Sequence, residues 1–145
     1  MNKIRQDVMG IITFENKLLL VKQRKANYWN FPKGGVNTNE SNEDALKREL
    51  FEETGLTNIK ILKEIKQTLY FDLPLELQKE TGFKGKLCHI FLIESKTKKI
   101  NLDYELSDFK WVKKEELFKM LDYENLKDLS KIAIEEFEKF GITIF

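Results

Sequence analysis

Three glutamates stand at spacings that bring them to one face of a helix. Glu52 and Glu53 follow Glu49 by three and four residues, so their side chains would be neighbours on an α-helix. Like charges placed this way destabilise a helix by roughly 0.2–0.5 kcal/mol per pair. A hard cation removes the conflict, because several carboxylate oxygens can coordinate one Mg²⁺ or Mn²⁺ ion. The cluster therefore predicts a divalent-metal site rather than an ordinary solvated acidic face.

The residues around the cluster predict a helix with defined ends. Ser41 is a favourable N-cap, and an acidic residue three positions later completes a capping-box pattern. Residues 42–54 contain neither Gly nor Pro, and Gly55 stands where a left-handed C-cap is wanted. Leu46 and Leu50 fall on an adjacent face, so we expect them to anchor the helix in the core.

The composition is that of one globular domain, spanning residues 1–145, with 41% hydrophobic and 12% aromatic residues. A net charge of +1 gives no overall attraction to nucleic acid or membrane, so a polyanion site would need local clustering of charge. The single cysteine, Cys88, cannot form an internal disulfide and fits a reducing cytosol. No apolar run approaches membrane-spanning length. We expect a cytoplasmic protein without a membrane partner, and no obligate protein partner is indicated.

Apolar, β-branched runs alternate with helical patterns along the chain. The expected strands are Val8–Thr13, Lys17–Gln23, Ile59–Phe71, Leu87–Glu94 and Phe109–Val112. Beyond the first helix, the helical patterns are Lys113–Leu121 and a run from Leu126 that ends near Gly141. A loop is expected from about Asp72 to Lys86. This mixture predicts an α/β fold, with helices packed on a mixed β-sheet.

The acidic helix belongs to a longer pattern that resembles the Nudix box. The pattern is Gly34, five residues, Glu40, seven residues, and then Arg48-Glu49-Leu50-x-Glu52-Glu53-x-Gly55-Leu56. In the Nudix hydrolases this loop–helix–loop binds metal, and the resemblance implies an α/β/α sandwich with a mixed β-sheet. It also implies Mg²⁺, with Mn²⁺ as an alternative, at a set of residues that comprises Gly34, Glu49, Glu52, Glu53 and Glu105.

The same resemblance implies catalytic roles. Glu52 and Glu53 would act through the metal, and Arg48 would orient the carboxylates of the box. Glu105 precedes the segment Phe109–Val112 and matches a loop glutamate that binds metal or serves as the general base in relatives. Which residue is the base stays open.

The flanks of the box resemble one branch of the family. Trp29–Asn37 reads Trp-Asn-Phe-Pro-Lys-Gly-Gly-Val-Asn, similar to the asymmetric diadenosine tetraphosphate hydrolases and the bacterial RNA 5′-pyrophosphohydrolases. Tyr70–Pro74 is similar to a segment in which a tyrosine contributes to nucleotide binding, and either Tyr70 or Phe71 takes that place here. Gly85–Phe91 lacks the glutamines and the lysine of the branch.

Substrate contacts are predicted from residue type. Arginine occurs only at positions 5, 24 and 48, which suggests that its planar fork is reserved for special sites. Lys33 and Arg24 would hold phosphates, and an aromatic side chain would stack on a base. The predicted substrate-binding residues are Arg5, Arg24, Trp29, Lys33, Tyr70 and Phe71. His89 and Cys88 are interpreted as structural, and the lysines of 79–86 as a solvated loop.

Two substrate classes follow, both nucleotide polyphosphates. The main expectation is asymmetric cleavage of diadenosine tetraphosphate to ATP and AMP, favoured over RNA by the neutral net charge and the missing glutamines. The alternative is an RNA 5′-pyrophosphohydrolase, or another pyrophosphatase acting on nucleoside triphosphates or ADP-ribose. A sensor that binds nucleotide without cleaving it is disfavoured, because every carboxylate of the box is present.

Overall fold

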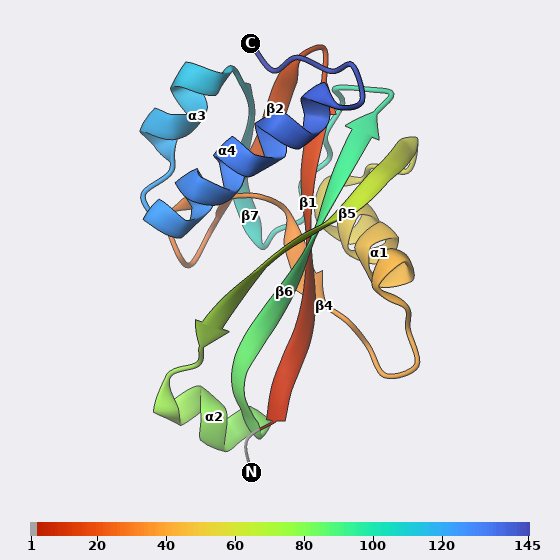
Figure 1. Cartoon of the computed structure of the whole chain (residues 1–145). Helices are drawn as coiled ribbons and strands as arrows, with labels where there is room; N and C mark the ends of the chain where they lie inside the picture. The colour runs from red at the N-terminus through yellow and green to blue at the C-terminus, as the bar shows by residue number, and fades with distance from the viewer. Residues whose placement is uncertain (1–2) are drawn as a thin grey trace.

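A computed structural model describes residues 3–145, which form a seven-stranded β-sheet and four helices (Figure 1). The strands are β1 (Lys3–Phe14), β2 (Lys17–Gln23), β3 (Trp29–Asn30), β4 (Lys33–Gly35), β5 (Ile59–Asp72), β6 (Phe83–Ser95) and β7 (Leu106–Val112). The helices are α1 (Asn42–Thr54), α2 (Leu75–Thr81), α3 (Lys114–Met120) and α4 (Glu124–Glu138). None of these helices is both long and apolar enough to cross a membrane.

The sheet is mixed, as predicted. Its order is β3-β2-β1-β6-β5, with β4 paired to β1 and β7 paired to β2. β1 and β6 run parallel, whereas the other pairs are antiparallel. β1 is therefore the central strand, and it carries Arg5, one of the predicted site residues.

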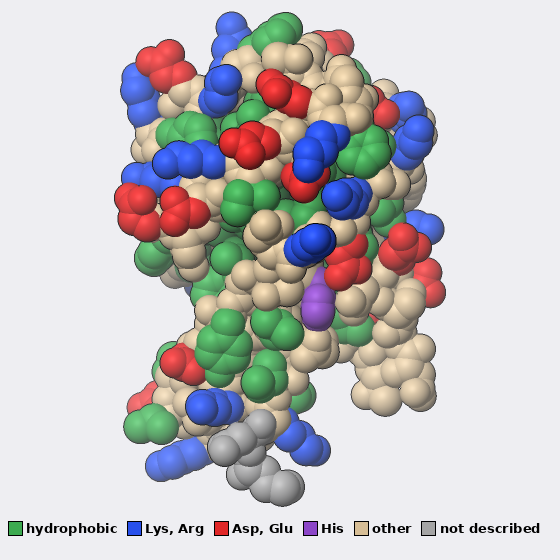
Figure 2. All heavy atoms as spheres, in the orientation of Figure 1, with side chains coloured by type: hydrophobic (Ala, Val, Ile, Leu, Met, Phe, Trp, Pro, Cys, Tyr) green, Lys and Arg blue, Asp and Glu red, His purple; other side chains and the backbone are tan. Residues whose placement is uncertain are grey.

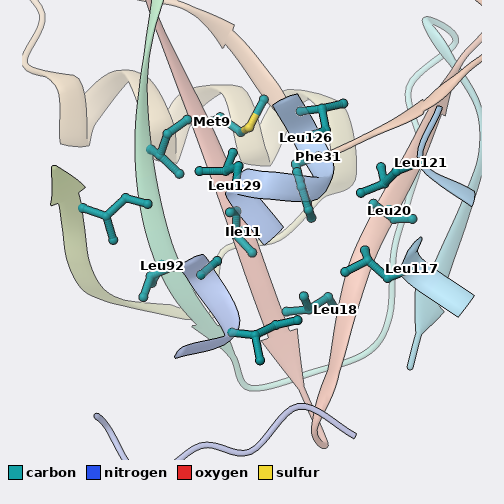
Figure 3. Packing of buried hydrophobic residues seen from close by; sticks show 14 of the residues in the cluster. Met9, Ile11, Leu18, Leu20, Phe31, Leu92, Leu117, Leu121, Leu126 and Leu129 are labelled. Atoms are coloured by element: carbon teal, nitrogen blue, oxygen red, sulfur yellow. The ribbon is translucent and has the colours of Figure 1, made fainter. Parts of the chain in front are cut away.

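The strands β1 and β2 read as unbroken apolar runs because both faces of the sheet are buried there. Val8 and Ile12 face one core cluster, while Met9 and Ile11 face the other. α1 covers the first cluster through Leu46 and its neighbours, and α3 and α4 cover the second (Figure 3). The predicted α/β/α sandwich is confirmed by this arrangement.

The ends of α1 lie where the sequence predicts them. The side chain of Ser41 accepts a hydrogen bond from the backbone N–H of Asp44 at 3.1 Å. Gly55 adopts φ 74° and its N–H donates to the carbonyl of Phe51. β1 and β2 form a hairpin through a two-residue turn in which Glu15 and Asn16 both have positive φ.

The predicted loop over residues 72–86 is wrong. It contains α2, whose N-cap is Pro74 and whose end is fixed by Gly82 at φ 77°. β6 then begins at Phe83, earlier than expected, because its first residues pair with β1 and β5. Together the first residues of β1, the last of β5, α2 and residues 83–87 of β6 project from the body (Figure 1). We call this projection the arm.

Candidate active site

The box helix delivers a buried carboxylate to a cleft. Glu53 is only 7% exposed, and its Oε1 accepts a hydrogen bond from the backbone N–H of Lys33 at 3.2 Å. It lines a cleft of about 510 Å³ between α1, β1, β4 and β6. The charged residues that line this cleft are Arg5, Asp7, Lys33, Glu49, Glu53, Lys86 and Glu105. Acidic and basic groups thus share one cavity.

Glu53 is held in an environment that opposes its ionisation. Burial, and after it the negative charge of Glu49, raise the pKa of the Glu53 carboxyl to about 8. Asp103 and Glu105 add to the effect, while the hydrogen bond from the Lys33 backbone opposes it. A positive charge arriving beside this carboxyl would favour the ionised form, so the pocket suits a cation.

Glu49 lies against the glycine that opens the box. A Cβ added at Gly34 would stand 2.0 Å from Cδ of Glu49, so no larger residue fits at position 34 without moving that carboxyl. Burial raises the pKa of Glu49, and the hydrogen bond from Arg48 opposes the rise. Close packing against Glu49 therefore explains why residue 34 is a glycine.

Arg48 ties the box together. Its Nε and Nη2 donate to the two oxygens of Glu40, each at 2.9 Å, and its Nη1 donates to Glu49 at 2.8 Å. Nη2 also donates to the carbonyl of Gly35 at 2.8 Å. The hydrogen bond from Arg48 lowers the pKa of Glu40 to about 2. The guanidinium thus contacts carboxylates of the box.

Glu52 is the most open of the three clustered glutamates. Its side chain is 53% exposed and reaches Arg48 at 3.5 Å. Within residues 3–145, no three acidic, histidine or cysteine side chains are already close enough to enclose one ion. The donors fit a hard cation by chemistry, since all are carboxylate oxygens and those of Glu49 and Glu53 line one cleft.

Glu105 lines the same cleft as Glu53, although it is exposed. The preceding loop is attached to α1, because the N–H of Asp103 donates to the carbonyl of Glu53 at 3.2 Å. Arg24 contacts the same loop one and two residues further along the chain. Its Nε donates to the carbonyl of Tyr104 at 2.7 Å, and its backbone N–H donates to that of Glu105 at 2.9 Å. The Arg24 fork thus contacts the loop, and its predicted binding of phosphate stays a prediction.

The basic side of the cleft comes from β1, β4 and β6. Arg5 forms a two-point ion pair with the buried Asp7, at 2.7 and 3.0 Å. Lys86 is paired with Arg5 across β1 and β6, and its pKa is lowered first by burial and then by the charge of Arg5. The Lys33 ammonium completes this group. Asp7 and Lys86 were not predicted as site residues, because only strand pairing brings them here.

The aromatic candidates separate into different places. Lys33 Nζ lies 5.2 Å from the ring centre of Phe71, beside the cleft. Tyr70 faces the other side of β5, where its hydroxyl covers Gly85. Trp29 packs against the core cluster of Figure 3, and Lys22 Nζ lies 5.8 Å from the centre of its ring. Tyr28, which was not predicted, lines the cleft. Stacking of a base on any of them stays a prediction.

The structural interpretation of Cys88 and His89 agrees with their surroundings. Cys88 is buried, and burial followed by the charge of Asp7 raises the pKa of its thiol to about 12. His89 Nε2 lies 2.7 Å from Oε1 of Gln6 on the neighbouring strand. Neither side chain lines the cleft, as far as residues 3–145 show.

Comparison with known proteins agrees with this geometry. A family model described as the NUDIX domain matches residues 3–132. A protein named RNA pyrophosphohydrolase from Sulfurovum sp. (strain NBC37-1) is 38% identical over 122 residues, covering 80% of this chain and 77% of its own. Another of that name, from Campylobacter jejuni subsp. jejuni serotype O:23/36 (strain 81-176), is 32% identical over 134 residues, covering 88% and 85%.

Solved structures show the same fold. A C. elegans Ap4A hydrolase complex superimposes with a TM-score of 0.74 at 22% identity, covering 94% of this chain and 97% of the other. A NUDIX-family hydrolase from Clostridium perfringens gives 0.75 at 20% identity, covering 94% and 99%. Since the family model spans most of the chain and relatives exceed 30% identity, the chain belongs to the Nudix family of pyrophosphohydrolases.

Proposed function

We propose that this Nudix hydrolase is an RNA pyrophosphohydrolase, which shortens the triphosphate at the 5′ end of RNA. Two relatives at 38% and 32% identity carry that name. The likeness to Ap4A hydrolase, at 22% identity, supports the fold alone. Cleavage of diadenosine tetraphosphate, the main expectation from the sequence, is therefore less well supported than its alternative.

The observation that carries the proposal is the mixed charge of the cleft. Arg5, Lys33 and Lys86 line the same cleft as the carboxylates of Glu49, Glu53 and Glu105. A triphosphate needs positive groups along its length, and a cation between its oxygens and the carboxylates. The neutral net charge of the whole chain does not describe this cleft, which three basic and four acidic side chains line.

A divalent metal fits this donor set, and Nudix hydrolases generally use one. The carboxylates of Glu49, Glu52 and Glu53, with the backbone of Gly34, would coordinate the ion. We propose that the ion is Mg²⁺. When bound, the ion offsets phosphate charge and acidifies a water molecule. Arg48 fixes the direction of Glu49 through its hydrogen bond, so it is a positioning residue in this proposal.

The remaining residues have distinct tasks in the proposal. Lys33, Arg5 and Lys86 hold phosphate oxygens, and Phe71 stacks on the first base beside Lys33. Glu105 accepts a proton from the attacking water, since its loop places it in the cleft with Glu53. Arg24 keeps that loop in position through the carbonyl of Tyr104.

A direct comparison of substrates tests the proposal. Purified protein with Mg²⁺ is given a short 5′-triphosphorylated RNA or diadenosine tetraphosphate, and kcat/KM is measured for each. The proposal expects a larger kcat/KM for the RNA, with 5′-monophosphorylated RNA as product. A larger kcat/KM for the dinucleotide, with ATP and AMP as products, would contradict it and restore the main expectation from the sequence.

A further inference from the structure

The tip of the arm carries a basic hollow that the proposed reaction does not use. It measures about 600 Å³ and lies between α2, the start of β1 and the start of β6. Lys3, Lys79 and Lys84 line it together with Leu75 and Phe83. No acidic side chain is among its lining residues, as far as residues 3–145 are concerned. The lining of the hollow therefore presents positive charge beside apolar side chains. Figure 2 shows basic, acidic and hydrophobic side chains together on the surface of the arm.

The hollow and the catalytic cleft are lined by neighbouring residues of the same two strands. On β1, Lys3 lines the hollow and Arg5 lines the cleft, and residues two apart on a strand share a face. On β6, Lys84 lines the hollow and Lys86 lines the cleft. Along β1 the two sites are thus one step of about 7 Å apart. β6 has a register irregularity at the same place, because Phe83 pairs with Lys3 and Gly85 with Ile4. The lysines and Arg5 form a basic path along the arm.

α2 is oriented so that its basic side chain faces this path. Lys79 lines the hollow, whereas Glu76 and Glu80 of the same helix do not. The helix is tied to the end of β5, because Gln78 Nε2 donates to the carbonyl of Leu73 at 2.7 Å. Leu75 is 72% exposed at the start of the helix. An apolar side chain left in solvent next to three lysines offers a contact for a base.

We propose that the arm binds the RNA strand behind its 5′ end, with phosphates on the three lysines and a base against Leu75 or Phe83. This inference rests on the proposed function, since it concerns the chain that follows the triphosphate. Single-stranded nucleic acid is bound by a positive groove that follows its backbone, together with apolar or aromatic surfaces for its bases. The arm offers both, directly beside the cleft.

Length dependence of the reaction is the measurable consequence. A triphosphorylated dinucleotide reaches only the cleft, while a strand of about 12 nucleotides, within the range of single-strand binding sites, also reaches the arm. We expect a lower KM for the longer RNA with wild-type protein. In the triple variant Lys3→Ala/Lys79→Ala/Lys84→Ala, the KM for the longer RNA rises about tenfold, and the salt dependence of its binding weakens by about 2 in slope. Kinetics on the dinucleotide stay at the wild-type value.

The chain supplies a matched control at α3. Lys113→Ala/Lys114→Ala/Lys119→Ala removes three charges from a hollow that Glu115 and Glu116 also line. This variant keeps the wild-type KM for both RNAs. Equal length dependence in the arm variant, the control and the wild type would overturn the inference.

Binding of RNA that lacks a 5′ phosphate separates this inference from the proposed function. A fluorescent 5′-hydroxyl RNA of the longer length is titrated with wild type, the arm variant and the α3 control, and anisotropy is recorded. Weakened binding by the arm variant alone supports the arm, whether or not the wild type hydrolyses RNA. Equal binding by all three proteins refutes the arm, and failure to hydrolyse either RNA refutes only the proposed function.

Discussion

Gly34 and Glu49 are in such close contact that a methyl group on Gly34 would lie 2.0 Å from the carboxyl carbon of Glu49. The contact joins β4 to α1, two elements that are separate in sequence and adjacent in the cleft. It explains why a glycine opens the box, since the backbone at position 34 has a carboxylate where a side chain would be. Packing, and not a left-handed backbone conformation, requires glycine here, because Gly34 does not have a positive φ.

Replacing this glycine should therefore displace Glu49. We expect Gly34→Ala to lower kcat by at least roughly 10²-fold, the usual cost of removing a group that stabilises the transition state. Gly35→Ala is the matched control, because the atoms nearest to its new Cβ would be those of the Arg5 side chain, at 3.2–3.3 Å rather than 2.0 Å. A smaller loss is expected there. Equal kcat in the two variants, with unchanged melting temperatures, would contradict the packing argument.

Arg48 and Glu40 should behave as one unit. Two hydrogen bonds at 2.9 Å join them, and the same guanidinium reaches Glu49. Lys at position 48 keeps the charge and loses the fork, so Arg48→Lys should lower kcat about tenfold or more while KM changes little. Glu40→Gln should cost less than Arg48→Lys, and the double variant should cost less than the sum of both. Additive effects on kcat would show that the two residues act independently.

The buried Glu53 should make stability depend on pH. Its pKa lies at about 8, raised by burial and by the charge of Glu49 from the ordinary value of 4.5. The folded state thus binds a proton that the unfolded chain has released, so stability falls as the pH rises from 4.5 to about 8. In EDTA, the melting temperature of wild type should fall by several degrees across this window relative to Glu53→Gln. Parallel pH profiles for the two proteins would refute the pKa assignment.

Phe71 and Tyr70 provide a comparison between two faces of one strand. Phe71 lies beside Lys33 at the cleft, while the Tyr70 ring covers Gly85 on the other face. Phe71→Leu should raise the KM for RNA roughly tenfold, because stacking on a base is worth about 1–3 kcal/mol. Tyr70→Leu removes the ring on the other face and should leave KM unchanged. A rise in KM for Tyr70→Leu alone would assign the base to that face.

Local patterns predicted the parts of the fold that are decided locally. α1 begins after Ser41 and ends at Gly55 because its caps are within the segment itself. β1 and β2 were predicted from their own apolar residues, without knowledge of the strands that they pair with. In the arm, α2 was missed although Pro74 and Gly82, which end it, lie in the segment itself, whereas the early start of β6 was missed because it depends on distant partners. β6 begins at Phe83 only because Lys3 of β1 and Asp72 of β5 bring its first residues into the sheet.

The residues of the candidate site also divide into those that local spacing predicts and those that only the fold brings together. Glu49, Glu52 and Glu53 lie within five consecutive residues, so helical spacing alone places them together. The contact of Arg24 with Tyr104 spans 80 residues, and no spacing rule connects them. Residue type gave a partial signal here: the three arginines at 5, 24 and 48 all use more than one nitrogen as a donor.

The central claim is that the carboxylates around Glu53 hold the divalent ion that makes hydrolysis of the RNA triphosphate possible. Titration of Mg²⁺ against the rate of 5′-monophosphate formation, in wild type and Glu53→Gln, tests it most directly. The wild-type rate should rise with Mg²⁺ from background in EDTA, and kcat of the variant should be at least roughly 10²-fold lower at saturating Mg²⁺. A variant kcat close to that of wild type at the same Mg²⁺ concentration would contradict the claim.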